Sequence, residues 1–148
     1  MDDLDLSTLI WLRMARFVQN SNQLSNEHLR QFGLTVAQFE ALAHIRNFEP
    51  ITQSELATGL TVSGGGISRM LTRLESEGLI SREQDWKTKH ISLTPKGREL
   101  LERAFPSQQK QQASLFDDSL SEDEKVQLHA LMKKLYDTSR KRGGSNLE

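Results

Sequence analysis

The sequence contains no cysteine and no long apolar run. The lack of cysteine excludes disulfide bonds, thiolate metal ligands and thiol-based redox sensing together. A membrane-spanning helix needs about 20 mostly apolar residues, whereas the richest run here, residues 9–18, contains Arg13 and Arg16. The opening residues MDDLDL are acidic, unlike the basic start of a secretory signal. We therefore expect a cytoplasmic protein without membrane contact.

The chain has little excess charge of either sign, with a net charge of −1 over 148 residues. This balance argues against a generally basic nucleic-acid coat. The distribution is uneven, because residues 53–98 carry seven Lys or Arg against five Asp or Glu, whereas residues 1–52 carry four against six. Charge alone leaves open whether the central excess marks a DNA-contacting surface or a solvated face. Length and composition predict one globular domain, residues 1–148, with a real core.

Signatures of catalysis and of metal binding are also lacking. The sequence has no G-x-S-x-G nucleophile elbow, and the glycines at 64–66 are not followed by the Lys-Ser/Thr of a phosphate-binding loop. The histidines are scattered, with none spaced four residues from another, although folding could bring distant ones together. We expect no enzyme activity, no cofactor and no metal site.

The most informative stretch is residues 52–80, TQSELATGLTVSGGGISRMLTRLESEGLI. Thr52 and Glu55 have the spacing of a capping box, Ser63 can cap a second short helix, and Gly78 suits the left-handed turn that ends it. Apolar residues line the inner faces of both helices. Hydroxyl and cationic side chains occupy the outer face of the second helix: Ser68, Arg69, Thr72 and Arg73. This layout is typical of a helix-turn-helix that enters the major groove of DNA.

The flanking segments predict a mainly α fold with a small β-hairpin, called a wing. We expect helices from the N-terminal region to near Gly33, over residues 36–48, from Thr94 onward and over residues 121–140. The pairs Thr35–Gln38 and Ser121–Glu124 have the spacing of capping boxes, and the Thr94 hydroxyl can cap the helix that follows it. Strands are expected at residues 79–83 and 90–94 around a tip at 84–89. Pro106 is expected either to kink or to split the helix that contains it. A winged helix-turn-helix lobe, residues 34–98, is then flanked by dimerisation helices in residues 1–33 and 99–142.

The string L-x-V-S-x-x-x-I-S-R-x-L-x-R-L-E-x-x-G-L-I, followed by D-x-K and S-L-T-P-K-G, resembles the MarR family of bacterial transcription regulators. The resemblance covers nearly the whole chain and implies a homodimer whose two winged lobes grip a pseudo-palindromic operator. The residues support a dimer independently, because the first helix is more apolar than the surface of a monomer allows.

The resemblance also implies which residues face DNA. Ser68 and Arg69 are the candidates for base edges, and Arg73 for a phosphate. In the wing, Asp85 matches an acid that in the family holds an arginine, but the matching position here is Lys87, which has no planar fork. We therefore expect weaker minor-groove reading and more phosphate attraction. The complete set of expected DNA contacts is Thr52, Gln53, Thr61, Ser63, Gly64, Gly65, Gly66, Ser68, Arg69, Arg73, Asp85, Lys87 and Lys89.

Two groups of aromatic residues have competing interpretations. Trp86, at the wing tip, either packs against the neighbouring helix or touches DNA sugar, and we favour packing. Trp11, Met14, Phe17 and Phe105 either line a pocket for a small effector, as the resemblance suggests, or belong to the core and dimer interface, which is the commoner role at helical spacing.

The sequence thus predicts a homodimeric, sequence-specific DNA-binding regulator. We expect a repressor that a small aromatic or anionic effector releases from double-stranded DNA. The alternative is a dimeric helical interaction protein whose winged lobe binds a protein partner.

Overall fold

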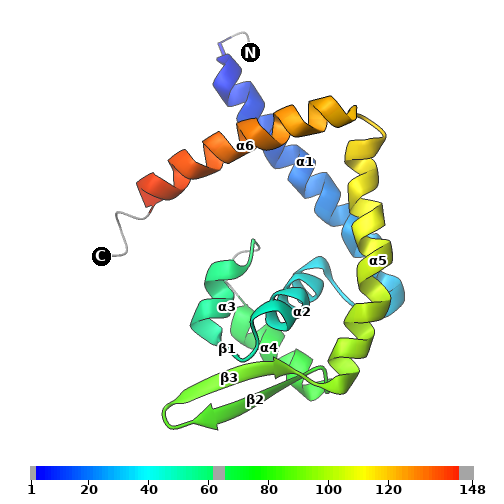
Figure 1. The fold of residues 1–148 in the computed structure, drawn as a ribbon, viewed down its shortest axis with the longest axis vertical. Helices are drawn as coiled ribbons and strands as arrows, with labels where there is room; N and C mark the ends of the chain where they lie inside the picture. Colours follow the sequence, from blue (N-terminus) through cyan, green and yellow to red (C-terminus); the bar gives the residue numbers. More distant parts are fainter. Residues whose placement is uncertain (1–2, 62–65, 144–148) are drawn as a thin grey trace. The chain divides into compact units, whose positions relative to one another are not determined.

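The computed structural model describes residues 3–61 and 66–143, which form mainly helices and one small sheet (Figure 1). The chain divides into two compact units, residues 1–111 and residues 112–148. The first unit contains the helix-turn-helix and the wing. Over the described residues, no helix combines the length and the apolarity needed to cross a membrane.

The first helix, α1 (Leu6–Leu29), starts where the Asp5 carboxylate accepts a hydrogen bond of 2.7 Å from the backbone N–H of Thr8. This bond satisfies an N–H group that has no partner within the helix, and it holds the pKa of Asp5 below its ordinary value. A short 3₁₀ turn, η1 (Arg30–Phe32), continues the chain to Gly33, whose φ of 70° is left-handed. The predicted end of the helix near Gly33 is confirmed.

The second helix, α2 (Val36–Phe48), starts with the predicted reciprocal cap. The Gln38 N–H donates to Thr35 Oγ1 at 3.2 Å, and the Thr35 N–H donates to Gln38 Oε1 at 3.0 Å. The side chains of Ala41, Leu42 and Ile45 are fully buried. Local capping therefore sets where α2 starts, and its apolar face anchors it in the lobe.

The helix-turn-helix consists of α3 (Gln53–Gly59) and α4 (Ile67–Ser76). Thr52 caps α3 as predicted, by accepting from the Glu55 N–H at 3.2 Å. The predicted Ser63 cap is wrong for α4, since the residue before the helix is Gly66 with a φ of 87°. Consecutive glycines cost a helix about 1 kcal/mol each relative to alanine, which explains the late start. Ser63, Gly64 and Gly65 lie outside the described residues.

The wing is longer than predicted, because its strands β2 (Ile80–Asp85) and β3 (Thr88–Leu93) include most of the expected tip. Only Trp86 and Lys87 remain as a two-residue turn between the paired residues Asp85 and Thr88. A third strand, β1 (Ile51–Thr52), pairs with β3 to complete an antiparallel sheet in the order β1-β3-β2. Two residues carry no detectable periodicity, so β1 could not be expected from the sequence.

Helix α5 (Pro95–Asp117) continues through Pro106, so of the two expected outcomes, a kink or a split, the split is wrong. Proline removes one helical hydrogen bond and costs about 3 kcal/mol, and the burial of Leu101 and Ala104 in the preceding turns helps to offset that loss. The start of α5 is the predicted cap, with Thr94 Oγ1 accepting from the Gly97 N–H at 3.0 Å. In the first unit, Gln108 Nε2 joins α5 to α1 through a 2.8 Å bond to Ser25 Oγ.

The hydrophobic core lies in the first unit, where α2, α3, α4, the sheet and α5 meet. Its buried members are Leu29, Leu34, Ala41, Leu42, Ile45, Ile51, Leu56, Ile67, Leu71, Leu74, Leu79, Ile80, Ile91, Leu93, Leu101 and Ala104. Except for Leu29, the core contains no residue of α1, whose apolar side chains are mostly exposed.

The second unit contains the end of α5 and helix α6 (Glu122–Gly143). The predicted capping box at its start is confirmed, because Ser121 Oγ and Glu124 Oε1 each accept from the other residue's backbone N–H, at 3.2 and 3.0 Å. Bonds from Lys125 to Asp117 and Glu122 raise the pKa of Lys125. Six large apolar side chains of α6 are exposed: Val126, Leu128, Leu131, Met132, Leu135 and Tyr136.

Candidate nucleic-acid interface

The outer face of α4 presents Ser68 and Arg69 to solvent. Gln53 Nε2, at the start of α3, donates to Ser68 Oγ at 2.7 Å. This bond ties the two helices together and leaves the Ser68 hydroxyl hydrogen available for an external acceptor. Within the described residues, Arg69 forms no ion pair, so its guanidinium is available to bind the edge of a base.

Arg73 lies one turn further along α4, as the sequence predicted. Its Nε donates to Glu77 Oε1 at 3.1 Å, and its side chain is 70% exposed. An exposed pair four residues apart on a helix contributes only about 0.3–0.5 kcal/mol. Glu77 therefore does not prevent Arg73 from binding a phosphate or another anion.

Arg82, which the sequence analysis did not select, holds the wing against α4. Its Nε and Nη2 donate to the two carboxylate oxygens of Glu75, at 3.2 and 3.1 Å, and Nη2 also reaches Thr72 Oγ1 at 3.4 Å. A guanidinium bound at two points resists rotation, so β2 keeps its position relative to α4. The bond from Arg82 lowers the pKa of Glu75. The sequence carried no signal for this pair, because the two residues come together only when β2 packs on α4.

Thr61 is already engaged within the protein. Its backbone N–H and its hydroxyl donate to the two carboxylate oxygens of Glu40 in α2, the latter at 2.7 Å. Thr52 in turn serves as the cap of α3. Thr52 and Thr61, both expected to contact DNA, therefore form hydrogen bonds within the protein that position the helix-turn-helix. Glu40 is 21 residues away from Thr61 in the sequence, which is why pattern reading missed it.

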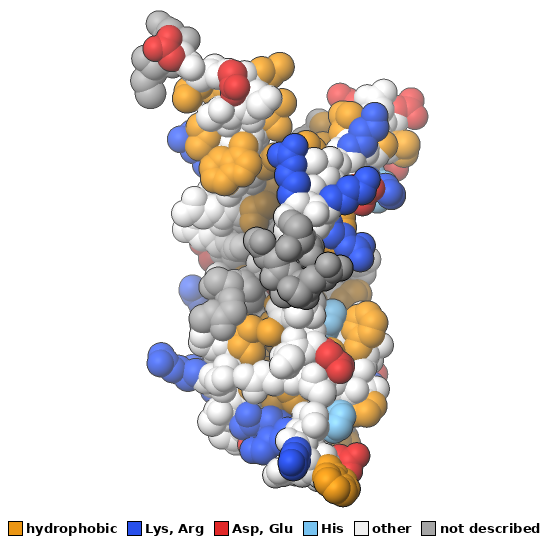
Figure 2. All heavy atoms as spheres, turned by 90° about the vertical axis from the view of Figure 1, so that its left-hand side faces the viewer, with side chains coloured by type: hydrophobic (Ala, Val, Ile, Leu, Met, Phe, Trp, Pro, Cys, Tyr) orange, Lys and Arg blue, Asp and Glu red, His pale blue; other side chains and the backbone are white. Residues whose placement is uncertain are grey.

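The wing tip exposes Asp85, Trp86, Lys87 and Lys89. Trp86 is 89% exposed, and its backbone has a φ of 58°. The favoured prediction that Trp86 packs against the neighbouring helix is wrong, because a two-residue turn carries the side chain beyond the end of the sheet. Figure 2 views the side to which the hairpin points, and blue cationic groups lie beside an orange hydrophobic group at the lower end of this face.

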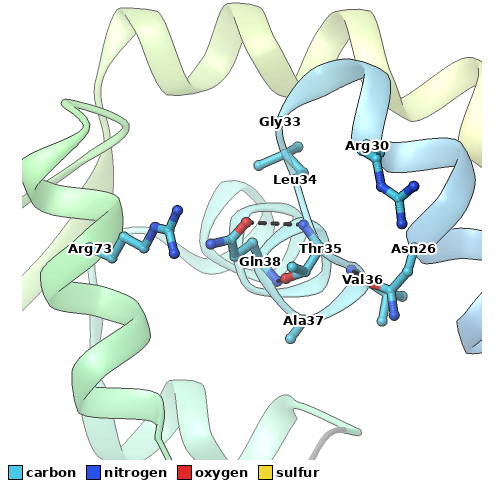
Figure 3. Close-up of a pocket in the computed structure, with 9 residues that line it drawn as sticks. All are labelled: Asn26, Arg30, Gly33, Leu34, Thr35, Val36, Ala37, Gln38 and Arg73. Carbon is cyan, nitrogen blue, oxygen red and sulfur yellow. Dashed lines mark hydrogen bonds between the residues drawn. The ribbon is translucent and has the colours of Figure 1, made fainter.

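A cavity of about 610 Å³ lies between the α1–α2 connection and α4. Figure 3 shows Arg73 on one side of it and Arg30 on the other, with the capped start of α2 between them. Its lining residues are Asn26, Arg30, Gly33, Leu34, Thr35, Val36, Ala37, Gln38 and Arg73. Two guanidinium groups around a partly apolar hollow suit a small organic anion.

The predicted aromatic effector pocket involves different residues, and it stays a prediction. Phe105 stacks on Phe39 with ring centroids 5.8 Å apart, and Arg46 lies 4.7 Å from the centre of the Phe105 ring. Trp11 is 63% exposed. In the part of the chain that the structure describes, no three His, Asp or Glu side chains come together as a metal site could require.

Residues 34–87, which include the helix-turn-helix and most of the wing, match the MarR family. A protein of Bacillus cereus, described as an uncharacterized HTH-type transcriptional regulator, is 56% identical over 142 residues, covering 96% of this chain and 97% of its own. The multiple antibiotic resistance protein MarR of Salmonella typhimurium is 32% identical over 120 residues, covering 79% of this chain and 83% of its own.

Among solved structures, a cysteine-to-serine mutant of MarR from E. coli in complex with operator DNA superposes with a TM-score of 0.76. It is 32% identical, and the match covers 89% of this chain and 99% of that one. The exposed face of α4, the wing held beside it and the similarity to these relatives all indicate a DNA-binding protein of this family. The chain therefore belongs to the MarR family and is a transcription regulator that binds DNA.

Proposed function

We propose that this regulator is a homodimeric repressor, acting in the cytoplasm, that occupies a pseudo-palindromic operator until a small anionic or aromatic effector releases it. The observation that supports sequence-specific DNA binding is the state of Arg69 on α4. Its side chain is exposed, and it forms no ion pair with any of the described residues. Beside Arg69, the bond from Gln53 fixes Ser68. A bidentate arginine is the commonest way in which a protein reads guanine.

The apolar surface of α1 supports the dimer. Its large exposed side chains are Leu6, Leu9, Ile10, Trp11, Phe17, Val18 and Leu24. A monomer rarely exposes apolar patches of more than a few hundred Å², and α6 presents a second such face. A twofold dimer places its two recognition helices about 34 Å apart, one turn of DNA, so the expected operator has two half-sites at that spacing.

The cavity between Arg30 and Arg73 supports an effector site. An aromatic carboxylate bound there would contact α4 through Arg73 and the 3₁₀ turn η1 through Arg30. Binding alone changes no equilibrium, so release requires that the ligand bind more tightly to the lobe arrangement that fits DNA poorly. A carboxylate that recruits Arg73 also removes a cation from the DNA-facing helix. The change in lobe arrangement and the loss of the Arg73 charge would both weaken binding to DNA.

The DNA-binding part is tested with duplexes that the wild-type protein enriches from a random-sequence pool. We expect an enriched site with twofold symmetry, and we expect Arg69→Ala to reduce affinity for it by about 5- to 150-fold, the range of one bidentate base contact. Arg46→Ala, on α2, is the matched control because it removes an arginine from the same lobe. Equal losses in the two variants would contradict the role of Arg69.

Repression is tested by placing the enriched site across a promoter in transcription reactions with purified components. We expect less transcript as protein is added and recovery with benzoate, a simple aromatic anion, but not with benzyl alcohol, its neutral counterpart. The double variant Arg30→Ala/Arg73→Ala should lose the response to benzoate. An increase in transcript on adding protein would refute repression, and an unchanged benzoate response in the double variant would refute this effector site.

A further inference from the structure

Trp86 has a backbone conformation that its side chain disfavours. It is the first residue of the two-residue turn between Asp85 and Thr88, and its φ is 58°. Hairpin turns with a positive φ at this position strongly favour glycine, asparagine or aspartate. A bulky side chain in the left-handed region is a real departure from the usual backbone. Such departures cluster at binding sites, where a partner offsets their cost.

The indole of Trp86 also gains little from the folded lobe. It is 89% exposed, the most exposed of the large hydrophobic side chains in the described chain. The backbone carbonyl of Trp86 accepts a hydrogen bond of 3.2 Å from Gln84 Nε2, which stabilises the turn without covering the ring. The free protein therefore keeps a large apolar ring in water on a disfavoured backbone, and neither feature helps it to fold.

The surroundings of Trp86 point to DNA as its partner. Lys87 follows it in the turn, and Lys89 lies on the adjacent strand, paired with Gln84. Both lysines are exposed, and the only acid in the tip, residues 84–89, is Asp85. An apolar protein surface would leave these two ammonium groups without partners, whereas phosphates flanking a groove would bind both.

The part of the wing that projects is its outer end. The Arg82–Glu75 contact holds β2 against α4, and residues 83–89 beyond it are exposed. Figure 1 shows this end of the hairpin extending away from the helices of the lobe. At about 3.3 Å per residue, the three residues from Glu83 to Asp85 extend about 10 Å, and the turn with the indole of Trp86 lies beyond them. Half a turn of DNA, which separates a major groove from the adjacent minor groove, is about 17 Å, so the long side chains at the tip span the remaining distance.

We propose that Trp86 enters the minor groove flanking each half-site and packs its indole against the deoxyribose walls, while Lys87 and Lys89 bind the phosphates on either side. The minor groove is about 6 Å wide and its walls are largely sugar, so a flat apolar ring fits along them. Apolar side chains are used in this groove by other DNA-binding proteins. The inference rests on DNA binding by this chain and adds a contact that is apolar rather than ionic.

The first experiment separates DNA contact from folding with the variants Trp86→Gly and Trp86→Phe. Glycine accepts a positive φ without strain, so Trp86→Gly should melt at the same temperature as the wild type or higher. Its affinity for the duplex that the wild type enriches from a random pool should fall about tenfold, within the range of one aromatic contact with a nucleotide. Trp86→Phe, which keeps a flat ring, should stay within about threefold of the wild type.

The second experiment uses salt to distinguish the indole from the lysines. Affinity falls with salt according to the number of phosphates contacted, by about 0.9 in the logarithmic slope for each. Trp86→Gly should lower the affinity at every salt concentration and leave the slope unchanged. Lys87→Ala, the matched control in the same turn, should reduce the slope. The difference in tryptophan fluorescence between the wild type and Trp86→Phe reports Trp86 alone. Acrylamide should quench this difference signal less when the protein is bound to the duplex than when it is free.

Several results would overturn the inference. They are wild-type affinity in Trp86→Gly, a loss in Trp86→Phe as large as in Trp86→Gly, or a melting temperature of Trp86→Gly that falls with its affinity. A change in oligomeric mass without a change in affinity would assign the indole to contacts between protein copies and would also refute it. If the wild type enriches no duplex at all, DNA binding itself fails, which is a different result from normal binding by the variants.

Discussion

Replacing Gly97 with alanine should break the junction between the wing and α5. A Cβ atom at this position would lie 2.0 Å from the carbonyl oxygen of Leu79 and 2.9 Å from its carbonyl carbon. Both contacts are with backbone, so no side-chain rotation can relieve them. Real Cβ atoms are essentially never closer than 3.0 Å. The first turn of α5 and the backbone of Leu79, just before β2, must therefore separate by about 1 Å.

The cost follows from what that separation disrupts. Forcing extra volume into a well-packed site costs about 1–3 kcal/mol. The same carbonyl of Leu79 accepts from the Thr94 N–H at 3.1 Å, and the loss of this bond costs about 0.5–1.5 kcal/mol more. The higher helix propensity of alanine returns at most about 1 kcal/mol. The expected net loss is about 2–3 kcal/mol, from a total stability that is about 5–15 kcal/mol for most proteins.

Thermal unfolding at a fixed protomer concentration measures this loss, because the proposed dimer would make the melting temperature depend on concentration. For a chain of about 150 residues, each kcal/mol lowers the melting temperature by about 2–4 °C, so Gly97→Ala should melt about 4–12 °C below the wild type. Two matched controls are Gly59→Ala, whose Cβ would meet the movable ring of His44 at 2.2 Å, and Gly143→Ala, whose Cβ would meet nothing within 4 Å.

The reasoning predicts an order of cost: Gly97→Ala is largest, Gly59→Ala is smaller because the ring of His44 can turn aside, and Gly143→Ala is close to zero. A melting temperature of Gly97→Ala within 2 °C of the wild type, the smallest shift that 1 kcal/mol produces, would refute it. So would a larger loss at Gly59 than at Gly97. Either result would mean that the first turn of α5 and the backbone of Leu79 can separate at little cost in stability.

Three further predictions concern single positions. Arg69→Ala should weaken binding to the enriched duplex about 5- to 150-fold and broaden the base preference in a repeated selection, whereas an equal weakening on all sequences would reassign Arg69 to phosphate. Gly33→Ala should cost about 1 kcal/mol by urea unfolding, since its φ is 70° and its Cβ would meet nothing within 4 Å; no measurable loss would show that the turn adapts. Because Arg82 holds the pKa of Glu75 below its ordinary value of 4.5, the stabilisation is present above about pH 4.5 and is lost as pH falls through the folded-state pKa. Glu75→Gln should therefore show a weaker fall in melting temperature over that acid range, and an acid dependence identical to the wild type would contradict the contribution of this pair.

The sequence predicted well where the cause of a structure is local. The capping pairs Thr35–Gln38 and Ser121–Glu124 form as expected, and the left-handed glycine at Gly33 closes the first helical segment. Each of these signals lies within a few residues, so the chain needs no distant partner to form it. The predicted cap at Ser63 is wrong for α4, which starts after Gly66, because glycine has a low helix propensity.

By itself, then, the sequence determined the order of the helices, the positions of most caps, the existence of a wing and the family to which the chain belongs. Only the tertiary structure decided which predicted contact residues are already engaged, as Thr61 is by Glu40, which arginine holds the wing, and that Trp86 is exposed rather than packed. It also brought Arg30 and Arg73 around one cavity. The reason is physical: a cap or a turn is an interaction between neighbours along the chain, whereas these pairings depend on the packing of elements that lie far apart in the sequence.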